Sequence, residues 1–289
     1  MTSDLKSKYD ALRSILESMR SVAIGYSGGV DSTLLVKVAV DVLGDKTLAM
    51  IGRSKTYPTR EFEEAVALAE KLGARYVVVD TEETDDLKFR ENPPDRCYYC
   101  KTELFGKLQE LAERERIAWI ADGTIADDVG DFRPGMRAKS ENNVRSPLLE
   151  AGMSKEDVRS LSKELGLPTW DKPSFACLSS RFPYGTGITP QNLTKVDHAE
   201  TYLRDAGFRR FRVRFHDEHT ARIEVGPDDI PRFLDPVFRE TLVARFKELG
   251  FLYVTLDLKG YRTGSMNEVL SEAEKSRYTA DSGQHTADS

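Results

Sequence analysis

Two groups of residues in this chain have types and spacings suited to chemistry. One is the segment SGGVDS at residues 27–32, which holds two glycines, two serines and an aspartate directly after the apolar run Val22–Tyr26. The other is a set of three cysteines, in which Cys97 and Cys100 are separated by two residues and Cys177 stands far from them. Glycine-rich turns after a strand bind phosphate through backbone N–H groups, and thiolates bind metals or act as nucleophiles. The sequence therefore points to nucleotide chemistry and to thiol or metal chemistry.

The segment SGGVDS is predicted to be a phosphate-binding loop of an unusual kind. Gly28 and Gly29 carry no side chains, so phosphate oxygens can approach the backbone and the positive end of the helix that follows. The segment lacks the lysine of the G-x-x-x-x-G-K-[ST] loop. We expect the Ser27 and Ser32 hydroxyls to replace part of that lysine's role, and Asp31 to hold a magnesium ion. The alternative is a tight strand-to-helix turn without a ligand.

The cysteines do not form an even-numbered disulfide framework, which favours metal or redox chemistry. Cys97 and Cys100 are close enough in sequence to share a metal. Three thiolates suit an iron–sulfur cluster with one open iron, or a zinc ion with one open position. The alternative is three unconnected structural cysteines.

The first half of the chain alternates short apolar runs with amphipathic helical patterns, which predicts an α/β fold with a parallel sheet covered by helices. Helices are predicted at residues 30–43 and 60–72. The predicted strands are residues 22–26, 47–52, 75–80 and 118–122.

Several polar residues follow these predicted strands, and ligands of parallel sheets bind at the carboxyl ends of the strands. Gly123 and Thr124 follow the last of the four strands and are candidate contacts for adenosine, and Lys55 after the second strand is a candidate nucleotide contact. Asp127 and Asp128 are weaker magnesium candidates than the loop aspartate, and a solvated loop is their alternative.

The second half changes character near residue 172 and predicts a smaller α+β domain. Its elements are a helix from Pro190 to Ala206, strands at 211–215, 221–225 and 251–256, and a helix over 229–249 interrupted near Pro236. The predicted organisation is thus a nucleotide-binding domain at 1–172, a substrate domain at 173–270 and a disordered polar tail at 271–289.

The strand at 211–215 alternates apolar and basic residues, so its arginines are expected on an open face of the sheet. Arg212 and Arg214 leave the same face and could clamp a phosphate group. Ser180 and Arg181, which follow Cys177 closely, could join them. The alternative for alternating arginines is an ordinary solvated sheet face.

Composition excludes several classes of protein. The chain has 289 residues, of which 39% are hydrophobic and 31% charged, and its net charge is −6. No apolar run approaches the ~20 residues of a membrane helix, and the N-terminus does not resemble a signal peptide, so a cytoplasmic location is expected. The acidic balance argues against a broad nucleic-acid-binding surface. The acidic run at 82–86 is most simply a solvated loop.

The segment SGGVDS resembles the PP-loop of the N-type ATP pyrophosphatases, which cleave ATP to AMP and pyrophosphate while adenylating a carbonyl or carboxylate. Three further stretches resemble the LarE family of sulfur transferases, which act in the synthesis of the nickel-pincer nucleotide cofactor. The resemblance covers roughly residues 5–270, and the stretches are ADGTIADDVGDFRPG at 121–135, KPSFACLSSRFPYGT at 172–186 and FRVRFH at 211–216.

The resemblance implies that ATP and Mg²⁺ are used to convert the carboxylates of pyridinium-3,5-biscarboxylic acid mononucleotide into thiocarboxylates. It makes Arg212 and Arg214 the contacts of the mononucleotide phosphate, and it favours this role over a solvated sheet face. Glu200 and Glu224 are weaker candidates for orienting the substrate or acting as a base. The family also implies a homo-oligomer, either trimer-based or hexameric.

The resemblance also bears on the source of sulfur. Some family members carry only the cysteine that matches Cys177 and surrender its sulfur, leaving dehydroalanine. Others carry three cysteines and resemble cluster-dependent thiolation enzymes, and this chain has that pattern. A 4Fe–4S cluster on Cys97, Cys100 and Cys177 is therefore predicted, with sacrifice of Cys177 as the rival and the sulfur donor unidentified. A transfer RNA thiolase and a nucleotide-binding module without chemistry are the alternative functions.

Overall fold

A computed structural model of the chain describes residues 1–129, 135–173, 176–262 and 264–280. The chain divides into two compact units. The first comprises residues 1–83, 95–175 and 276–289, and the second comprises residues 84–94 and 176–275.

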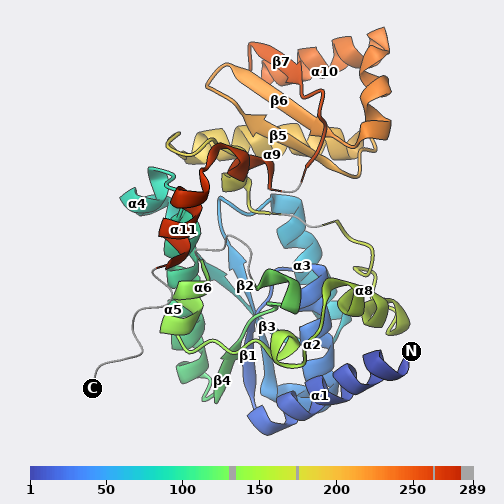
Figure 1. Ribbon diagram of the computed structural model, residues 1–289, viewed down its shortest axis with the longest axis vertical. Helices are drawn as coiled ribbons and strands as arrows, with labels where there is room; N and C mark the ends of the chain where they lie inside the picture. Colours follow the sequence, from blue (N-terminus) through green and yellow to red (C-terminus); the bar gives the residue numbers. More distant parts are fainter. Residues whose placement is uncertain (130–134, 174–175, 263, 281–289) are drawn as a thin grey trace. The chain divides into compact units, whose positions relative to one another are not determined.

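The first unit is built on a four-stranded parallel sheet (Figure 1). The strand order is β3-β2-β1-β4, so the phosphate-loop candidate after β1 lies between the carboxyl ends of β2 and β4. The predicted α/β class and all four predicted strands are confirmed. The strands are β1 (Val22–Gly25), β2 (Thr47–Arg53), β3 (Arg75–Asp80) and β4 (Trp119–Ala121).

Both faces of this sheet are covered by helices because its strands are apolar on both sides. Ile24 of β1 and Ile51 of β2 belong to one buried cluster, whereas Ala23 and Met50 belong to another. The first cluster includes residues of α1 (Ser3–Met19), α2 (Val30–Leu43), α3 (Thr59–Lys71), α7 (Pro147–Glu150) and α8 (Lys155–Glu164), and the second includes residues of α5 (Arg96–Arg114) and α6 (Gly135–Glu141).

The second unit contains a three-stranded sheet in the order β5-β6-β7. Strand β5 (Phe211–Phe215) runs antiparallel to β6 (Thr220–Val225), which runs parallel to β7 (Tyr253–Leu256). The unit also contains α4 (Leu87–Arg90), α9 (Pro190–Asp205) and α10 (Pro236–Glu248). The chain before α10 is a 3₁₀ helix at Pro227–Leu234, not the α-helix expected from residue 229, and Pro231 within it cannot donate an α-helical hydrogen bond.

Two boundaries differ from those expected. Residues 84–94 group with the second unit although they lie between β3 and α5 of the first unit. The tail expected to be disordered from residue 271 forms α11 (Glu272–Ala280). Ser271 explains this helix, because its hydroxyl accepts from the Glu274 N–H while the Glu274 carboxylate accepts from the Ser271 N–H, a capping box. The rest of the tail, 281–289, lies outside the described residues.

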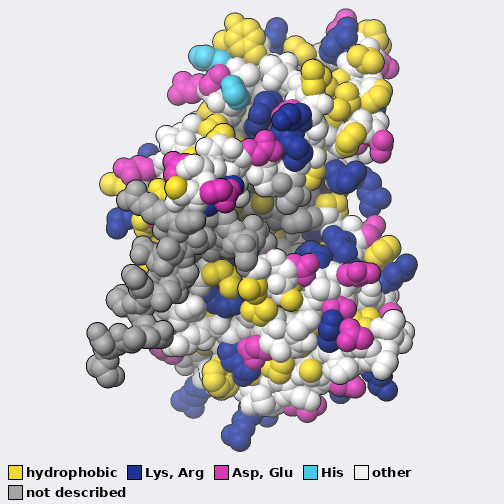
Figure 2. Space-filling view, viewed as in Figure 1, with side chains coloured by type: hydrophobic (Ala, Val, Ile, Leu, Met, Phe, Trp, Pro, Cys, Tyr) yellow, Lys and Arg dark blue, Asp and Glu magenta, His cyan; other side chains and the backbone are white. Residues whose placement is uncertain are grey.

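None of the helices described combines the length and apolar content that a membrane span requires. On the face shown in Figure 2, acidic side chains lie among the basic ones, as the net charge of −6 leads one to expect.

Candidate functional site

The phosphate-loop candidate at residues 27–32, here called the loop, is held by hydrogen bonds between its two serines. The Ser27 and Ser32 hydroxyls lie 3.1 Å apart, and the Ser27 N–H donates to Ser32 Oγ at 3.3 Å. Helix α2 begins at Val30, and no side chain in the described part of the protein caps its first turn. The first N–H groups of a helix have no intrahelical acceptor, so this turn presents donors and the positive end of the helix dipole to an anion.

Gly28 is the position in the loop that only glycine fits. Its φ of +61° lies in the left-handed region, and a Cβ placed there would lie 2.7 Å from Cβ of Ala65 on α3. A side chain would therefore bring both backbone strain and a clash with a neighbouring helix. Helix α3 thus packs directly against the loop at Gly28.

Two side chains fix the loop's carbonyl groups from outside. The Tyr57 hydroxyl donates to the Ser27 carbonyl, and Lys172 Nζ lies 3.4 Å from the Gly28 carbonyl oxygen. Lys172 is also paired with two glutamates of α3, Glu61 at 2.7 Å and Glu64 at 3.1 Å. Burial, with the charge of Glu61, raises the pKa of Tyr57 well above its ordinary value, so its hydroxyl stays protonated as a donor. These contacts thus engage the Ser27 and Gly28 carbonyls of the loop.

Asp31, the magnesium candidate, lies in the first turn of α2 and is paired with a lysine. Lys155 Nζ is 2.7 Å and 2.8 Å from the two carboxylate oxygens. A cation that binds Asp31 must therefore displace or share this ammonium group. Mg²⁺ in phosphoryl-transfer sites commonly uses one or two carboxylates together with substrate phosphates, so a single aspartate beside the loop fits such an ion.

The other magnesium candidates have structural roles. Asp128 accepts the backbone N–H of Ile125 at 3.1 Å, and Asp127 accepts that of Lys155 at 2.8 Å. Asp127 therefore helps to anchor the start of α8, the helix whose lysine pairs with Asp31. Within the described ranges, no three His, Cys, Asp or Glu side chains gather where they could hold a metal ion.

Gly123 and Thr124 lie beside the loop, as their position after β4 predicts. A Cβ on Gly123 would be 3.0 Å from the Ser32 nitrogen, so this glycine packs directly on the first turn of α2.

The Thr124 hydroxyl belongs to a hydrogen-bond network around Asp122, to which it donates at 2.6 Å. Ser146 also donates to Asp122 and accepts from Lys139 Nζ. Burial lowers the pKa of Lys139. This network holds the turn after β4 against α2.

The turn after β2 carries Lys55, whose side chain is exposed. This turn contacts Glu83, a member of the acidic run that was expected to form a solvated loop. That expectation is wrong for Glu83, which is only 2% exposed. Its Oε1 accepts from Thr56 Oγ1 at 2.6 Å and from Ser54 Oγ. An acidic run gives no sequence signal that one member is buried, because the hydroxyl partners lie 27 and 29 residues earlier in the chain.

The three cysteines form no disulfide bond in the described part of the chain, and each is half-buried. Cys97 and Cys100 lie three residues apart in the first turns of α5, so their side chains share one face of the helix. The N-terminal turn of a helix stabilises thiolates, and a pair of thiolates at this spacing fits a soft metal or an iron–sulfur cluster. Cys177 belongs to the second unit, where it precedes a 3₁₀ turn at Leu178–Arg181.

Arg181 is the residue that holds the segment around Cys177. Its guanidinium donates to the carbonyls of Ala176 and Cys177 at 2.7 Å and 3.0 Å, and to Ser180 Oγ at 2.9 Å. The other side of the guanidinium forms a double hydrogen bond with Glu200, at 2.8 Å and 2.7 Å. These contacts engage the donors of the guanidinium, so Arg181 positions the segment that carries Cys177.

The pair of Arg181 and Glu200 is buried, with side-chain exposures of 0% and 3%. Burial alone would lower the pKa of Arg181, but the charge and hydrogen bonds of Glu200 outweigh it and raise that pKa. Burial would likewise raise the pKa of Glu200, but Arg181 outweighs it and lowers that pKa. Both groups are therefore ionised, and each compensates the burial of the other.

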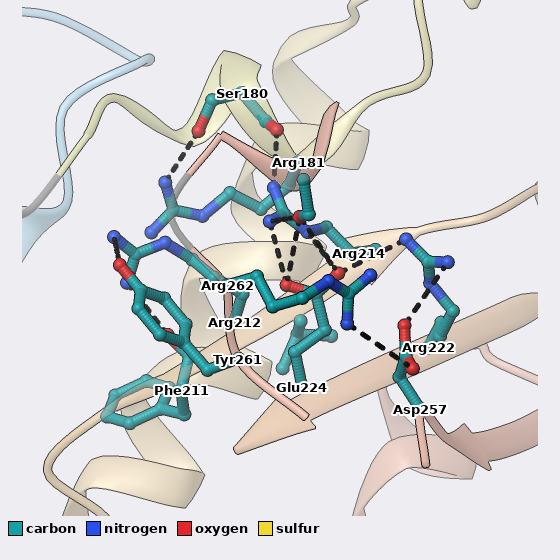
Figure 3. Close-up of polar contacts among 12 residues, drawn as sticks. Ser180, Arg181, Phe211, Arg212, Arg214, Arg222, Glu224, Asp257, Tyr261 and Arg262 are labelled. Carbon is teal, nitrogen blue, oxygen red and sulfur yellow. Dashed lines mark hydrogen bonds and ion pairs between the residues drawn. The ribbon is translucent and has the colours of Figure 1, made fainter. Parts of the chain in front are cut away.

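Arg214 is also buried, which corrects the expectation that the arginines of β5 lie on an open face. Only 5% of Arg214 is exposed, and it forms a double hydrogen bond with Glu224 at 2.9 Å and 2.7 Å. It donates further to the Ser180 carbonyl and to Ser265 Oγ (Figure 3). Alternating arginines predict a solvated face only when no acid faces them, and here Glu224 is the register partner of Arg212 on β6.

Arg212 is 6% exposed and makes a different set of contacts. It donates to the Phe211 carbonyl at 2.7 Å and to the Tyr261 hydroxyl at 3.3 Å, both neutral acceptors, and its guanidinium lies over the Tyr261 ring (Figure 3). Burial and the nearby charge of Arg181 lower the pKa of Arg212 to about 10. It therefore remains a cation at neutral pH.

The same face holds two more arginines around Asp257. Arg222 contacts Asp257 at 3.5 Å and Glu224 at 3.2 Å, and Arg262 contacts Asp257 at 3.8 Å (Figure 3). The five arginines are thus interleaved with four acids, which include Glu268 at 2.9 Å from Arg262, and the remaining positive charge favours an anionic ligand. The members of this group are Arg181, Arg212, Arg214, Arg222 and Arg262 with Glu200, Glu224, Asp257 and Glu268.

Comparison with known proteins connects these features. A family model described as NAD synthase matches residues 5–114. The chain is 42% identical over 271 residues to the pyridinium-3,5-bisthiocarboxylic acid mononucleotide synthase of Lactiplantibacillus plantarum, covering 93% of this chain and 97% of the relative. The chain belongs to the LarE family. The LarE resemblance inferred from the sequence is confirmed.

Two further relatives match this LarE-family chain over most of their lengths. The uncharacterized protein slr1717 of Synechocystis is 46% identical over 93% of this chain and 100% of its own length. The uncharacterized protein MJ0830 of Methanocaldococcus jannaschii is 30% identical over 84% of this chain and 92% of its own. These matches extend through both compact units.

Sequence reasoning missed two lysines at the loop of this LarE-family chain. Lys155 pairs with Asp31 from 124 residues away, and Lys172 contacts the Gly28 carbonyl from 144 residues away. The only signal for Lys172 was its place at the start of KPSFACLSSRFPYGT. Lys155 follows a capping serine at a helix start, and that pattern carries no information about which acid it meets.

Proposed function

We propose that this protein is an ATP-dependent sulfur transferase that converts the carboxylates of pyridinium-3,5-biscarboxylic acid mononucleotide into thiocarboxylates. The observation that carries the proposal is the 42% identity, over nearly the whole of both chains, to a protein named as a synthase of the bisthiocarboxylic acid mononucleotide. The loop at the start of α2 supports it, because it presents N–H donors where a pyrophosphate leaving group needs them.

The proposed reaction has two steps, neither of which involves oxidation or reduction. A substrate carboxylate oxygen attacks the α-phosphorus of ATP, and the bond to pyrophosphate breaks to give an acyl adenylate. A hydrosulfide sulfur then attacks the acyl carbon, and the carbon–oxygen bond to AMP breaks to give the thiocarboxylate. The first step is needed because a carboxylate is a poor electrophile until its oxygen is converted into a good leaving group.

In this proposal the loop binds the leaving pyrophosphate. Gly28, Gly29 and the first turn of α2 supply N–H donors, and Ser27 and Ser32 supply hydroxyls. Asp31 would hold Mg²⁺, which neutralises phosphate charge when bound. Gly123, Thr124 and Lys55 remain proposed contacts of the nucleotide, and Asp128 is retained only as a weaker ligand because it already accepts a backbone N–H.

The second unit would bind the mononucleotide phosphate. Arg212 and Arg214 are its proposed contacts, and Glu224 already forms a double hydrogen bond with Arg214. Arg181 and Glu200 are proposed to position Cys177, with Ser180 beside them. Glu224 is proposed to orient Arg214.

Cys97, Cys100 and Cys177 are proposed to hold a 4Fe–4S cluster. Such a cluster would supply the sulfur nucleophile without consuming a protein sulfur. Iron and acid-labile sulfide, measured after anaerobic purification, should be about four each per chain and should be lost in Cys97→Ala, Cys100→Ala and Cys177→Ala. Negligible iron after reconstitution would refute the cluster proposal. It would favour the alternative, in which Cys177 donates its own sulfur once.

The proposed activity is tested by measuring AMP and pyrophosphate release with and without the biscarboxylic acid mononucleotide. We expect release that depends on this substrate and is lost in Asp31→Asn. Release that depends instead on unmodified transfer RNA would favour a thiolase, and ATP binding without release would favour a nucleotide-binding module. A trimer-based or hexameric assembly and a cytoplasmic location remain predictions.

A further inference from the structure

Glu83 is a buried acid at the ligand-binding edge of the parallel sheet, and the proposed function makes no use of it. It lies three residues beyond the end of β3 and is 2% exposed. Thr56 Oγ1 and Ser54 Oγ, both in the turn after β2, donate to the same oxygen, Oε1. The Thr56 N–H donates in turn to Ser54 Oγ at 2.9 Å. One oxygen of the carboxylate is thus fully engaged.

The second oxygen of Glu83 is different. Oε2 is buried and has no hydrogen-bond partner among the residues described. A carboxylate accepts hydrogen bonds at both oxygens, and buried polar atoms are generally satisfied in folded proteins. The arrangement therefore keeps one acceptor oriented by two hydroxyls and leaves the other for a donor.

The turn that holds Glu83 also reaches the loop. Tyr57, the next residue after Thr56, donates its hydroxyl to the Ser27 carbonyl. On the opposite side of the loop, Gly123 packs directly against the first turn of α2. The turn after β2 thus connects Glu83 with the loop, at the sheet edge where a nucleotide whose phosphates occupy the loop would bind.

We propose that Glu83 Oε2 accepts a hydrogen bond from the nucleoside half of ATP, donated by a ribose hydroxyl or by the adenine amino group. This inference rests on the proposed ATP-dependent function. Acidic side chains after strands bind ribose hydroxyls in other nucleotide-binding sheets. Because Oε2 is enclosed, the donor must displace the groups that cover it. An analogue lacking the donor leaves the oxygen unpaired and is rejected strongly.

Binding of nucleotide analogues to the unmodified full chain gives the first test. Isothermal titration with Mg²⁺ and no carboxylate substrate would compare ATP with 2′-deoxy-ATP, 3′-deoxy-ATP and purine riboside triphosphate, which lacks the amino group. We expect one of the three to bind about tenfold more weakly than ATP, or worse. The analogue that fails identifies the donor.

The variant Glu83→Gln gives the second test, because its amide replaces Oε2 with a donor. It should bind ATP about tenfold more weakly and should no longer distinguish ATP from the analogue that failed. Glu82→Gln is the matched control, since it removes the same charge from an exposed neighbour and should bind like the parent. A thermal unfolding curve for each variant reports whether the fold is retained.

Equal binding of all four nucleotides by the parent would overturn the inference whatever the variant does, and would assign Oε2 to an ordered water molecule. Unchanged ATP affinity in Glu83→Gln would overturn it as well. Failure of the parent to bind ATP at all is a different result, because it would refute the proposed function and this inference with it.

Discussion

Arg181 and Glu200 are almost fully buried, and each depends on the other for its charge. Arginine suits this position because its planar guanidinium bonds both carboxylate oxygens and still reaches the carbonyls of Ala176 and Cys177. The pair therefore joins α9 to the segment that carries the candidate sulfur-handling cysteine. Its stability and the position of Cys177 are coupled through one side chain.

Removing one partner of this pair should be costly. Glu200→Gln leaves the Arg181 charge buried without a countercharge, and we expect a loss of about 3–5 kcal/mol in unfolding free energy. Urea denaturation would measure it. Glu268→Gln, which breaks an exposed pair with Arg262, is the control and should cause no comparable loss. Equal effects of the two changes would show that burial does not set the value of the pair.

The same pair predicts how stability depends on pH. The pKa of Glu200 is lower in the folded chain than in the unfolded chain, so its contribution is complete above the ordinary carboxyl pKa near 4.3 and is lost as the pH falls toward the folded value. The difference in unfolding free energy between the parent and Glu200→Gln should therefore be constant at neutral pH and shrink below about pH 4. A difference that grows on acidification would contradict this sign.

The pairing of Lys155 with Asp31 predicts competition with magnesium. Lys155→Met removes the ammonium from the carboxylate, so half-maximal AMP release should require less Mg²⁺ than in the parent. Asp31→Asn should abolish release at any Mg²⁺ concentration. A Lys155→Met enzyme that binds ATP much more weakly, with no change in its Mg²⁺ requirement, would instead assign Lys155 to the phosphates.

At the scale of elements, the loop depends on the helix beneath it. Strand β1 ends, the chain turns through Gly28 with a positive φ, and α2 begins within two residues. Helix α3 lies so close that Ala65 would touch any side chain at Gly28. The loop's shape is thus fixed by packing as much as by its own sequence.

Gly28→Ala should separate packing from backbone strain when compared with Gly44→Ala. Both glycines have a positive φ, but a Cβ at Gly44 meets nothing within 4 Å. Gly44→Ala should cost about 1–3 kcal/mol from backbone conformation alone and leave ATP affinity unchanged. Gly28→Ala should cost more and weaken ATP binding, as measured by titration calorimetry. Similar effects of both changes on ATP affinity would argue against the role given to α3.

How much the sequence could predict depended on whether a signal was local. The strand after Ser21 and the helix after Gly29 were predictable because periodic apolar residues and glycines lie within one short window. The buried state of Arg214 was not predictable, because Glu224, with which it forms a double hydrogen bond, lies on another strand. Glu83 was missed for the same reason, since Ser54 and Thr56 belong to a different turn.

At the scale of the whole molecule, the candidate chemistry is divided between the two units. The loop, Cys97 and Cys100 belong to the first, and Cys177 and the arginine group belong to the second. Family likeness extends over 93% of the chain, which is why the proposed function invokes both units together. Nucleotide activation and sulfur transfer are thus proposed for one chain.

The central claim is tested most directly by counting products in one anaerobic incubation with the biscarboxylic acid mononucleotide, ATP, Mg²⁺ and sulfide. Mass spectrometry would measure thiocarboxylate, AMP and the intact chain together. We predict one AMP for each thiocarboxylate formed, more than one thiocarboxylate per chain, and an unchanged chain mass. Absence of AMP and thiocarboxylate would contradict the claim. A yield that stops at one per chain, with the sulfur of Cys177 lost, would contradict catalytic delivery of sulfur by the three cysteines.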